Sequence, residues 1–136
     1  MKIIKALSVI LLFFNLSLSG QNLIGYNEKE IRQYMRDNQK NMDFQKFTNN
    51  STFKYLKYVD RDDSQTLLFF LTADSVCKSI RLVCDKSLKK MKTKEFDNIY
   101  KKGGENIWTE IKNGKRYIIE LKDEDFSLSI TFRSSE

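Results

Sequence analysis

The side chains that could do chemistry in this chain are carboxylates, lysines and two cysteines, because histidine is absent from its 136 residues. Without imidazole there is no Ser-His-Asp or Cys-His nucleophile system and no histidine-ligated zinc. The acidic cluster Asp60, Asp62 and Asp63 lacks the alternating third carboxylate, central glycine and distal glutamate of a calcium loop. The sequence also contains no Gly-rich phosphate loop. We therefore expect a protein that is not an enzyme and that binds neither a cofactor nor a metal.

The two cysteines, Cys77 and Cys84, are separated by seven positions. On one extended strand an odd separation places the two side chains on opposite faces, and their Cα atoms would lie about 23 Å apart at ~3.3 Å per residue. A disulfide joins Cα atoms only about 6 Å apart. We predict that they do not bridge each other. Cys84 is expected in the core, and Cys77 is either a quiet thiol on a surface face or an intermolecular link.

Two β-hairpins and two helices are expected to carry these side chains. Residues 66–85 form two β-rich runs around a polar turn at 73–75, and residues 115–133 repeat the pattern after an Asn113-Gly114 turn of type I′. Asn27 followed by Glu30 predicts the start of a helix that ends near residue 40. Residues 85–102 predict a second helix, ended by Gly103-Gly104. Shorter strands are expected at 44–48, 52–59 and 106–112.

The two halves of the chain match one another at low identity. The first helix aligns with the second at an offset of 65, and the first hairpin aligns with the second at an offset of 50. An internal duplication explains this match, although amphipathic units of one kind also share such periodicity. The fold class that we predict is α+β, with two αβββ halves forming one antiparallel sheet and two helices packed on one face. The pseudo-repeats cover about 26–84 and 85–133.

Alternation along the strands assigns residues to the two faces of this sheet. The apolar face, which the helices would cover, is expected to hold Leu67, Phe69, Leu71, Val76, Ile80, Leu82, Tyr117, Ile119, Leu121, Phe126, Ile130 and Phe132. The open face would carry Cys77, Ser79, Arg81, Ser127, Ser129, Thr131 and Arg133, with Leu68, Phe70 and Ile118 between them.

Aromatic side chains and arginines on the open face are the candidate binding residues. Trp108 has the opposite parity to Ile107 and Ile111, so it projects onto the open face if the isoleucines are core. Tyr58, Leu56 and Phe70 would join it. Trp and Tyr beside arginine are typical of protein interfaces, and the candidate site is Trp108, Tyr58, Phe70, Arg81 and Arg133. The alternative is that these rings fill a second small core beneath a loop.

The N-terminal residues 1–20 have the pattern of a secretory signal peptide. Lys2 and Lys5 precede an apolar run at 6–18, and Ser17 and Ser19 predict cleavage before Gly20 or Gln21. The run of 13 residues is shorter than the roughly 20 that span a bilayer, so no transmembrane span is expected. We therefore predict export to the periplasm and cell envelope or secretion, with residues 21–136 forming a single domain.

The net charge is mild. The chain carries 24 basic and 18 acidic residues, and loss of Lys2 and Lys5 with the signal leaves 22 minus 18, or +4. A lysine-rich helix is the main basic feature, and its residues Lys86, Lys89, Lys90 and Lys94 are candidates for weak contact with anionic surfaces. A solvated helix face is the alternative explanation. Nucleic acid is not expected, because aromatic residues do not interleave the lysines and the chain is exported.

The pattern 23–31 with a helix, then 53–58 and 68–76, resembles a known half-module. It is similar to the helix-plus-meander unit of the small outer-membrane assembly lipoprotein and of the β-lactamase inhibitor protein, which carries tandem copies. The resemblance implies an exported, non-catalytic binding role, with the open face of the sheet as the contact surface. We therefore expect a protein-binding module of the cell envelope or secretome. The alternative is a small envelope enzyme or ligand carrier with a carboxylate-lined pocket between sheet and helices.

Overall fold

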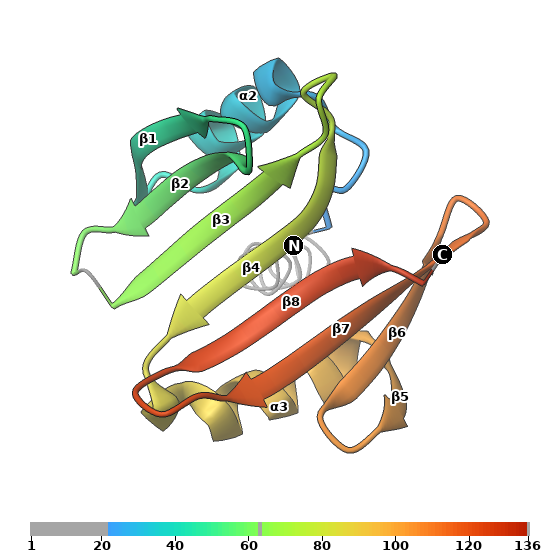
Figure 1. Cartoon of the computed structure of the whole chain (residues 1–136). Coiled ribbons are helices and arrows are strands. Elements are labelled where there is room, and N and C mark those ends of the chain that lie inside the picture. The colour runs from blue at the N-terminus through green and yellow to red at the C-terminus, as the bar shows by residue number, and fades with distance from the viewer. Residues whose placement is uncertain (1–21, 63, 136) are drawn as a thin grey trace, which may run out of the picture.

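The computed structural model describes residues 22–62 and 64–135 (Figure 1). The predicted signal peptide therefore lies outside the described residues. The described residues form two α-helices, one 3₁₀ turn and eight strands, in the order α2 (Glu28–Asn38), β1 (Met42–Asn49), β2 (Lys54–Asp60), β3 (Gln65–Leu71), β4 (Cys77–Cys84), η1 (Lys86–Leu88), α3 (Lys89–Ile99), β5 (Lys101–Gly104), β6 (Ile107–Lys112), β7 (Lys115–Asp123) and β8 (Leu128–Ser134). Within the described part of the chain, no helix is long and apolar enough to cross a membrane.

The eight strands form one sheet in the order β1-β2-β3-β4-β8-β7-β6-β5, and neighbouring strands are antiparallel throughout. The predicted α+β class, with an antiparallel sheet and two helices, is confirmed. The helix in each half is followed by four strands, where the αβββ repeat predicted three: the strand expected at 44–48 is present as β1, and β5 was not predicted. Strands β4 and β8 are central, and β1 and β5 are the two edges.

Side-chain caps mark the start of α2 and of the 3₁₀ turn that precedes α3. The Asn27 side chain accepts a hydrogen bond from the Glu30 backbone N–H at 2.8 Å, and Glu30 accepts one from the Asn27 N–H, which completes a capping box. Helix α2 ends at Asn38, two residues earlier than predicted. Asp85 caps the 3₁₀ turn that precedes α3, and its side chain accepts from the Ser87 N–H at 2.8 Å.

The second helix is shorter than predicted. Residue Tyr100 already has extended backbone angles, and Lys101–Gly104 form the edge strand β5 instead of a last helical turn. Pairing with β6 supplies the backbone hydrogen bonds that a continued helix would have made, and a bulge between Lys102 and Gly104 accommodates Gly103. The prediction that Gly103-Gly104 end the helix is wrong, because the helix already ends at Ile99 and both glycines lie inside a strand. The predicted turn at Asn113-Gly114 is confirmed as type I′, because both residues have positive φ.

The hydrophobic core lies between the two helices and one face of the sheet (Figure 1). Helix α2 contributes Ile31 and Met35, and α3 contributes Phe96. The rings of Phe96 and Phe132 make an edge contact at 6.3 Å between centroids, which ties α3 to the central strand β8. Strand residues that are almost wholly buried include Leu56, Phe69, Ile80, Ile119, Leu128, Ile130 and Phe132.

Most residues predicted for the apolar face are buried, with two exceptions. Phe126 is 96% exposed, because β7 continues to Asp123 and Phe126 falls in the turn closed by the Glu124 N–H to Ser127 carbonyl bond. Val76 is half-buried at the end of the β3–β4 turn. The assignment of residues to the apolar face is therefore correct within the strands and wrong for these two residues, which lie in turns.

A β-bulge overturns the placement of Cys77 on the open face. Phe70 pairs with Ser79 but Leu71 pairs with Cys77, so Lys78 is an extra residue in β4. The extra residue reverses the alternation, and Cys77 joins Cys84 in the core. Both cysteines are free, so the prediction that they do not bridge is confirmed although the opposite-face argument behind it is wrong. Burial raises the pKa of the Cys77 thiol to about 12.

Candidate binding surface on the open face of the sheet

The open face is the side of the sheet opposite α2 and α3, and two rows of paired residues cross it beside a third row, which has no net charge and contains Asp43, Val59, Thr66, Val83, Ser129 and Lys122. Cross-strand partners project to the same side of an antiparallel sheet, so the ladders can be followed from edge to edge. The first row contains Lys46, Lys57, Leu68, Arg81, Thr131, Glu120 and Ile107. The second row contains Thr48, Tyr55, Phe70, Ser79, Arg133, Ile118, Thr109 and Lys101.

An aromatic and cationic cluster lies on the part of this face that strands β2, β3 and β4 form. The rings of Tyr55 and Phe70 are 5.7 Å apart, and the guanidinium carbon of Arg81 is 5.7 Å from the Phe70 ring centroid. Both rings are half-buried and Arg81 is exposed. Leu68 pairs with Lys57 on one side and Arg81 on the other. These side chains offer apolar contact area between charged groups.

Arg133 extends the cluster across the centre of the sheet. It pairs with Ser79 on β4 and with Ile118 on β7, while Arg81 pairs with Thr131 two residues before Arg133. The two arginines are thus diagonal neighbours on β4 and β8, at a Cα spacing of about 7–8 Å. The structure therefore brings together three of the five predicted site residues, Phe70, Arg81 and Arg133.

Positive charge dominates the two rows. They hold five cations, Lys46, Lys57, Arg81, Arg133 and Lys101, and one carboxylate, Glu120, which is a net of +4. Within the described residues, ion pairs join Arg32–Glu28, Lys89–Asp123, Lys92–Glu95 and Lys102–Asp97, none of which belongs to the rows. A hydrogen bond to Thr48 lowers the pKa of Tyr55, and the charges of Lys46 and Lys57 act in the same direction against the effect of burial.

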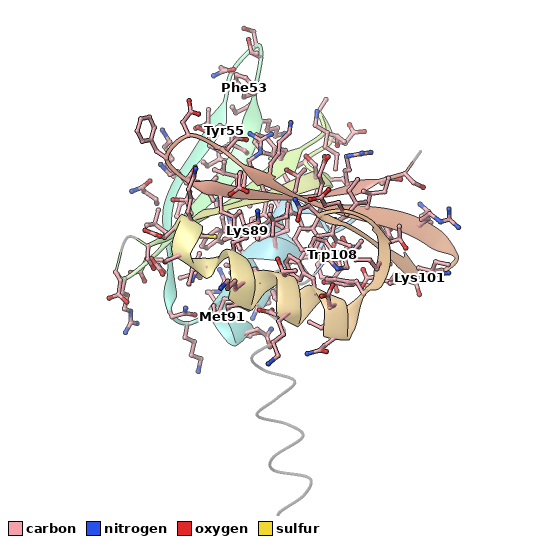
Figure 2. All side chains as sticks on the ribbon, turned by 90° about the horizontal axis from the view of Figure 1, so that it is seen from below. Phe53, Tyr55, Lys89, Met91, Lys101 and Trp108 are labelled. Atoms are coloured by element: carbon pink, nitrogen blue, oxygen red, sulfur yellow. The ribbon has the colours of Figure 1, made fainter. Side chains whose placement is uncertain are left out.

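Trp108 does not project onto the open face, and this prediction is wrong. Its indole is fully buried between α3 and the sheet, and its Nε1–H donates to the Asp97 carboxylate at 2.8 Å (Figure 2). The Phe96 ring lies 5.3 Å away in an edge contact. Trp108 pairs with the core residue Ile119, whereas Ile111 is 70% exposed, so the isoleucines of β6 belong to the open side.

Tyr58 also lies on the helix-covered face. It is buried, it pairs with Leu67, and its ring contacts Phe69 at 5.9 Å and Phe44 at 5.5 Å. Burial raises the pKa of its hydroxyl, against the charges of Arg32 and Arg36 on α2. Leu56, its neighbour on the same face, is likewise core. Trp108 and Tyr58 therefore fill core space, as the alternative held, but this is the main core beneath the helices and not a second small core beneath a loop.

Tyr55 and Lys57 are two residues beside the predicted cluster that sequence reasoning missed. They alternate with Leu56 and Tyr58 in β2, and the lysine marks the solvent side of that strand. The same alternation that placed Arg81 on the open face would have placed Tyr55 there. Figure 2 shows Tyr55 on the side of the sheet away from α3, whereas Trp108 lies beside the helix.

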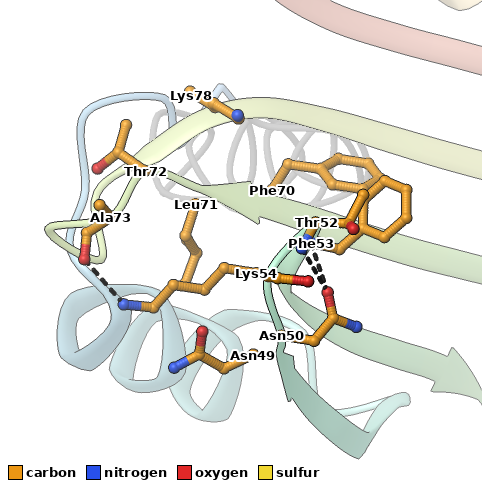
Figure 3. A pocket seen from close by; sticks show the side chains of 11 residues that line it. Asn49, Asn50, Thr52, Phe53, Lys54, Phe70, Leu71, Thr72, Ala73 and Lys78 are labelled. Atoms are coloured by element: carbon orange, nitrogen blue, oxygen red, sulfur yellow. Dashed lines mark hydrogen bonds between the residues drawn. The ribbon is translucent and has the colours of Figure 1, made fainter.

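Two shallow hollows of the described part have mostly cationic linings, whereas a third, of about 390 Å³ on α2, is lined by Lys29, Glu30 and Asp37. A groove of about 580 Å³ between α2 and β1 is lined by Arg32, Arg36 and Lys40 with one carboxylate, Asp43. A second hollow of about 360 Å³ lies between the β1–β2 and β3–β4 turns (Figure 3). Its lining includes Lys54, which donates to the Ala73 carbonyl at 3.1 Å, and Asn50, which accepts from the Phe53 N–H at 2.7 Å. Neither lining is the carboxylate pair that hydrolytic chemistry requires.

Two lysines of the lysine-rich helix α3 already contact carboxylates. Lys89 donates to the Asp123 carboxylate at 2.5 Å, and Lys92 is buried with its amine 3.8 Å from Glu95. Lys86, Lys90 and Lys94 are exposed. Among the described residues, no group of three or more potential metal ligands gathers at one place.

Fold and surface together define an α+β protein with one sheet face covered by two helices and the other exposed, cationic and partly apolar. Comparisons with protein-family models, curated proteins and solved structures found no match. The basis for a functional proposal is therefore the open face itself.

Proposed function

We propose that this protein is an exported, non-enzymatic binding module of the cell envelope or secretome that contacts another protein through the open face of its sheet. The observation that carries the proposal is the combination of half-buried Phe70, Tyr55 and Leu68 with exposed Arg81 and Arg133 on a face that neither helix covers. Aromatic residues and arginine are enriched at protein interfaces, where each provides a large contact area.

The size of the face is adequate for a specific contact. Eight strands spaced by about 4.8 Å span roughly 34 Å, and strands of about seven residues are roughly 20 Å long. The product is about 700 Å², close to the ~800 Å² that one partner contributes to a standard interface. A partner that covers most of the open face would thus make an interface of standard size without a deep pocket.

Export is part of the proposal and rests on the sequence. The pattern of residues 1–20 supports cleavage before Gly20 or Gln21. Intact-mass measurement of the protein recovered from the envelope or culture medium tests it. A mature chain that begins at Gly20 or Gln21 is the expected result, and a chain that retains Met1 in the cytoplasm would contradict export.

An origin by duplication is also proposed. It is supported by the element order, because each half has one helix followed by four strands and the two halves meet at β4 and β8. If both halves descend from one unit, the open face consists of two equivalent surfaces side by side. A partner would then contact both halves at once.

Site-specific photo-crosslinking in the native host tests the binding role. A photoreactive phenylalanine replaces Thr131, which is at the centre of the open face, and in a matched variant it replaces Met91, which is 55% exposed on α3 (Figure 2). We expect a discrete adduct with one protein from position 131 and none from position 91. Adducts of equal yield from both positions, or none from position 131, would refute the proposed surface. Circular dichroism of both variants confirms that each is folded.

A further inference from the structure

We infer that the partner of the open face is a protein with an acidic surface, whose carboxylates bind at Arg81 and Arg133 while its apolar side chains contact Leu68 and Phe70. This inference rests on the proposed function and specifies the chemistry of the partner. It depends on where the charge of the chain lies. The two open-face rows carry a net +4, which equals the net charge of the whole chain after residues 1–20 are removed.

The position of the two arginines favours carboxylate recognition. Both are exposed on the two central strands, and no ion pair of the described residues occupies either. A guanidinium presents paired N–H donors that match a carboxylate in a bidentate arrangement. Lys57 and Lys46 continue the positive charge along the same row toward the β1 edge. Such a field attracts acidic partners and accelerates their association.

The apolar residues between the cations favour a protein over another polyanion. Leu68 lies between Lys57 and Arg81 in one row, and Phe70 and Ile118 flank Ser79 and Arg133 in the other. A sulfated glycan or a lipid headgroup region would contact the cationic side chains and leave the apolar ones without a partner. A protein surface uses both, because it combines carboxylates with apolar side chains that exclude water around the charge pairs.

The test measures binding of a labelled acidic copolymer of Glu and Tyr to the purified protein by fluorescence anisotropy. The open-face variant R81Q/R133Q removes two charges, and the control variant K90Q/K94Q removes two exposed charges from α3. We expect the open-face variant to bind at least about fivefold more weakly, because two partly exposed charge pairs are lost, and the control variant to change by less than about twofold. Equal weakening in both variants, or weakening only in the control, would overturn the inference.

Further arms separate the kinds of polyanion. Dextran sulfate and vesicles that contain phosphatidylglycerol replace the copolymer, and the variant L68S/F70S removes the apolar contact. We expect L68S/F70S to weaken copolymer binding and to leave dextran sulfate binding unchanged. Equal affinity of wild type for all three probes, with no effect of L68S/F70S, would identify a general polyanion surface and overturn the inference. Thermal unfolding of each variant verifies that it is folded at the assay temperature.

Failure of this inference is distinguishable from failure of the proposed function. If position 131 still forms its adduct and R81Q/R133Q does not reduce the yield, the protein binds a partner whose charge is unimportant. In that case the binding role stands and the acidic partner is wrong. If position 131 forms no adduct, the binding role itself is wrong, whatever the copolymer does.

Discussion

Trp108 offers the sharpest test of how the sheet is divided into two faces. The indole is fully buried, donates a 2.8 Å hydrogen bond to Asp97 and makes an edge contact with Phe96 at 5.3 Å. Lys102, the cross-strand partner of Trp108 on β5, has its amine 4.4 Å from the centroid of the indole ring. The perturbation is Trp108→Ala, compared with Trp108→Phe and with Ile111→Ala on the opposite side of the same strand.

The magnitude follows from the buried area. A tryptophan side chain buries up to roughly 250 Å², which at ~25 cal/mol per Å² sets an upper limit of about 6 kcal/mol. Because the unfolded chain already buries part of this area, measured truncations of large aromatic residues cost about 3–5 kcal/mol. We expect about 4 kcal/mol for Trp108→Ala. Trp108→Phe keeps most of the ring but loses the bond to the half-exposed Asp97, which corresponds to about 1–2 kcal/mol.

Urea unfolding followed by circular dichroism measures these free energies of unfolding. Trp108 is the single tryptophan of the chain, so its variants cannot be followed by indole fluorescence. Ile111→Ala should change the free energy of unfolding by less than about 0.5 kcal/mol, because that side chain is 70% exposed. If Trp108→Ala were as mild as Ile111→Ala, the assignment of the two faces of β6 would be refuted.

The same variants decide whether Trp108 anchors a partner. If Trp108 acts only within the core, Trp108→Phe should retain the adduct from position 131 at wild-type yield, because the protein stays folded. Phe70→Ala should reduce that yield, because Phe70 lies on the open face. A Trp108→Phe variant that is folded and loses the adduct, beside a Phe70→Ala variant that keeps it, would contradict the proposed surface.

Two further predictions concern pH and one acidic turn. Burial raises the pKa of Cys77 and of Tyr34 to about 12, so both groups are neutral in the folded protein up to a higher pH than in the unfolded chain. The free energy of unfolding should therefore fall between about pH 9 and pH 12, as urea midpoints across that range will show; a constant midpoint would contradict it. Asp60 accepts hydrogen bonds from the Ser64 hydroxyl and from the Ser64 and Gln65 N–H groups, and together these lower its pKa although burial opposes them. Asp60→Ala should cost about 1–3 kcal/mol at pH 7 and less below the usual carboxyl pKa, where the wild type itself loses this stability; a cost that is the same at pH 3 and pH 7 would refute this account.

The parts of the fold that the sequence predicted are those set by local, repeated signals. The capping box at Asn27 and the Asn113-Gly114 turn are local, and both are confirmed. The open-face positions of Phe70 and Arg81 follow from the alternation of leucines and isoleucines in the hairpin strands, which is unambiguous there. These signals need no knowledge of which strand pairs with which.

The wrong predictions arise where the pairing of strands that are distant in the sequence determines the structure. Lys78 has no composition signal that marks it as a bulge, so the alternation was carried through it and Cys77 was placed on the wrong face. In β6, alternation gives two opposite sets but does not say which is covered, and only the pairing of Trp108 with Ile119 settles that choice. Lys101–Gly104 is a poor strand by propensity and becomes one because β6 offers a free edge.

The candidate surface has a property that neither half of the chain has alone. Arg81 belongs to the first half and Arg133 to the second, and they become neighbours only because β4 pairs with β8. Phe70 and Ile118, the apolar residues on either side of this seam, likewise come from different halves. A separate half would present one arginine beside an unpaired strand edge, which favours self-association over selective binding. Pairing of the two halves therefore removes that edge and brings the two central arginines together. The proposed binding surface and the stability of the sheet thus depend on the same two strands.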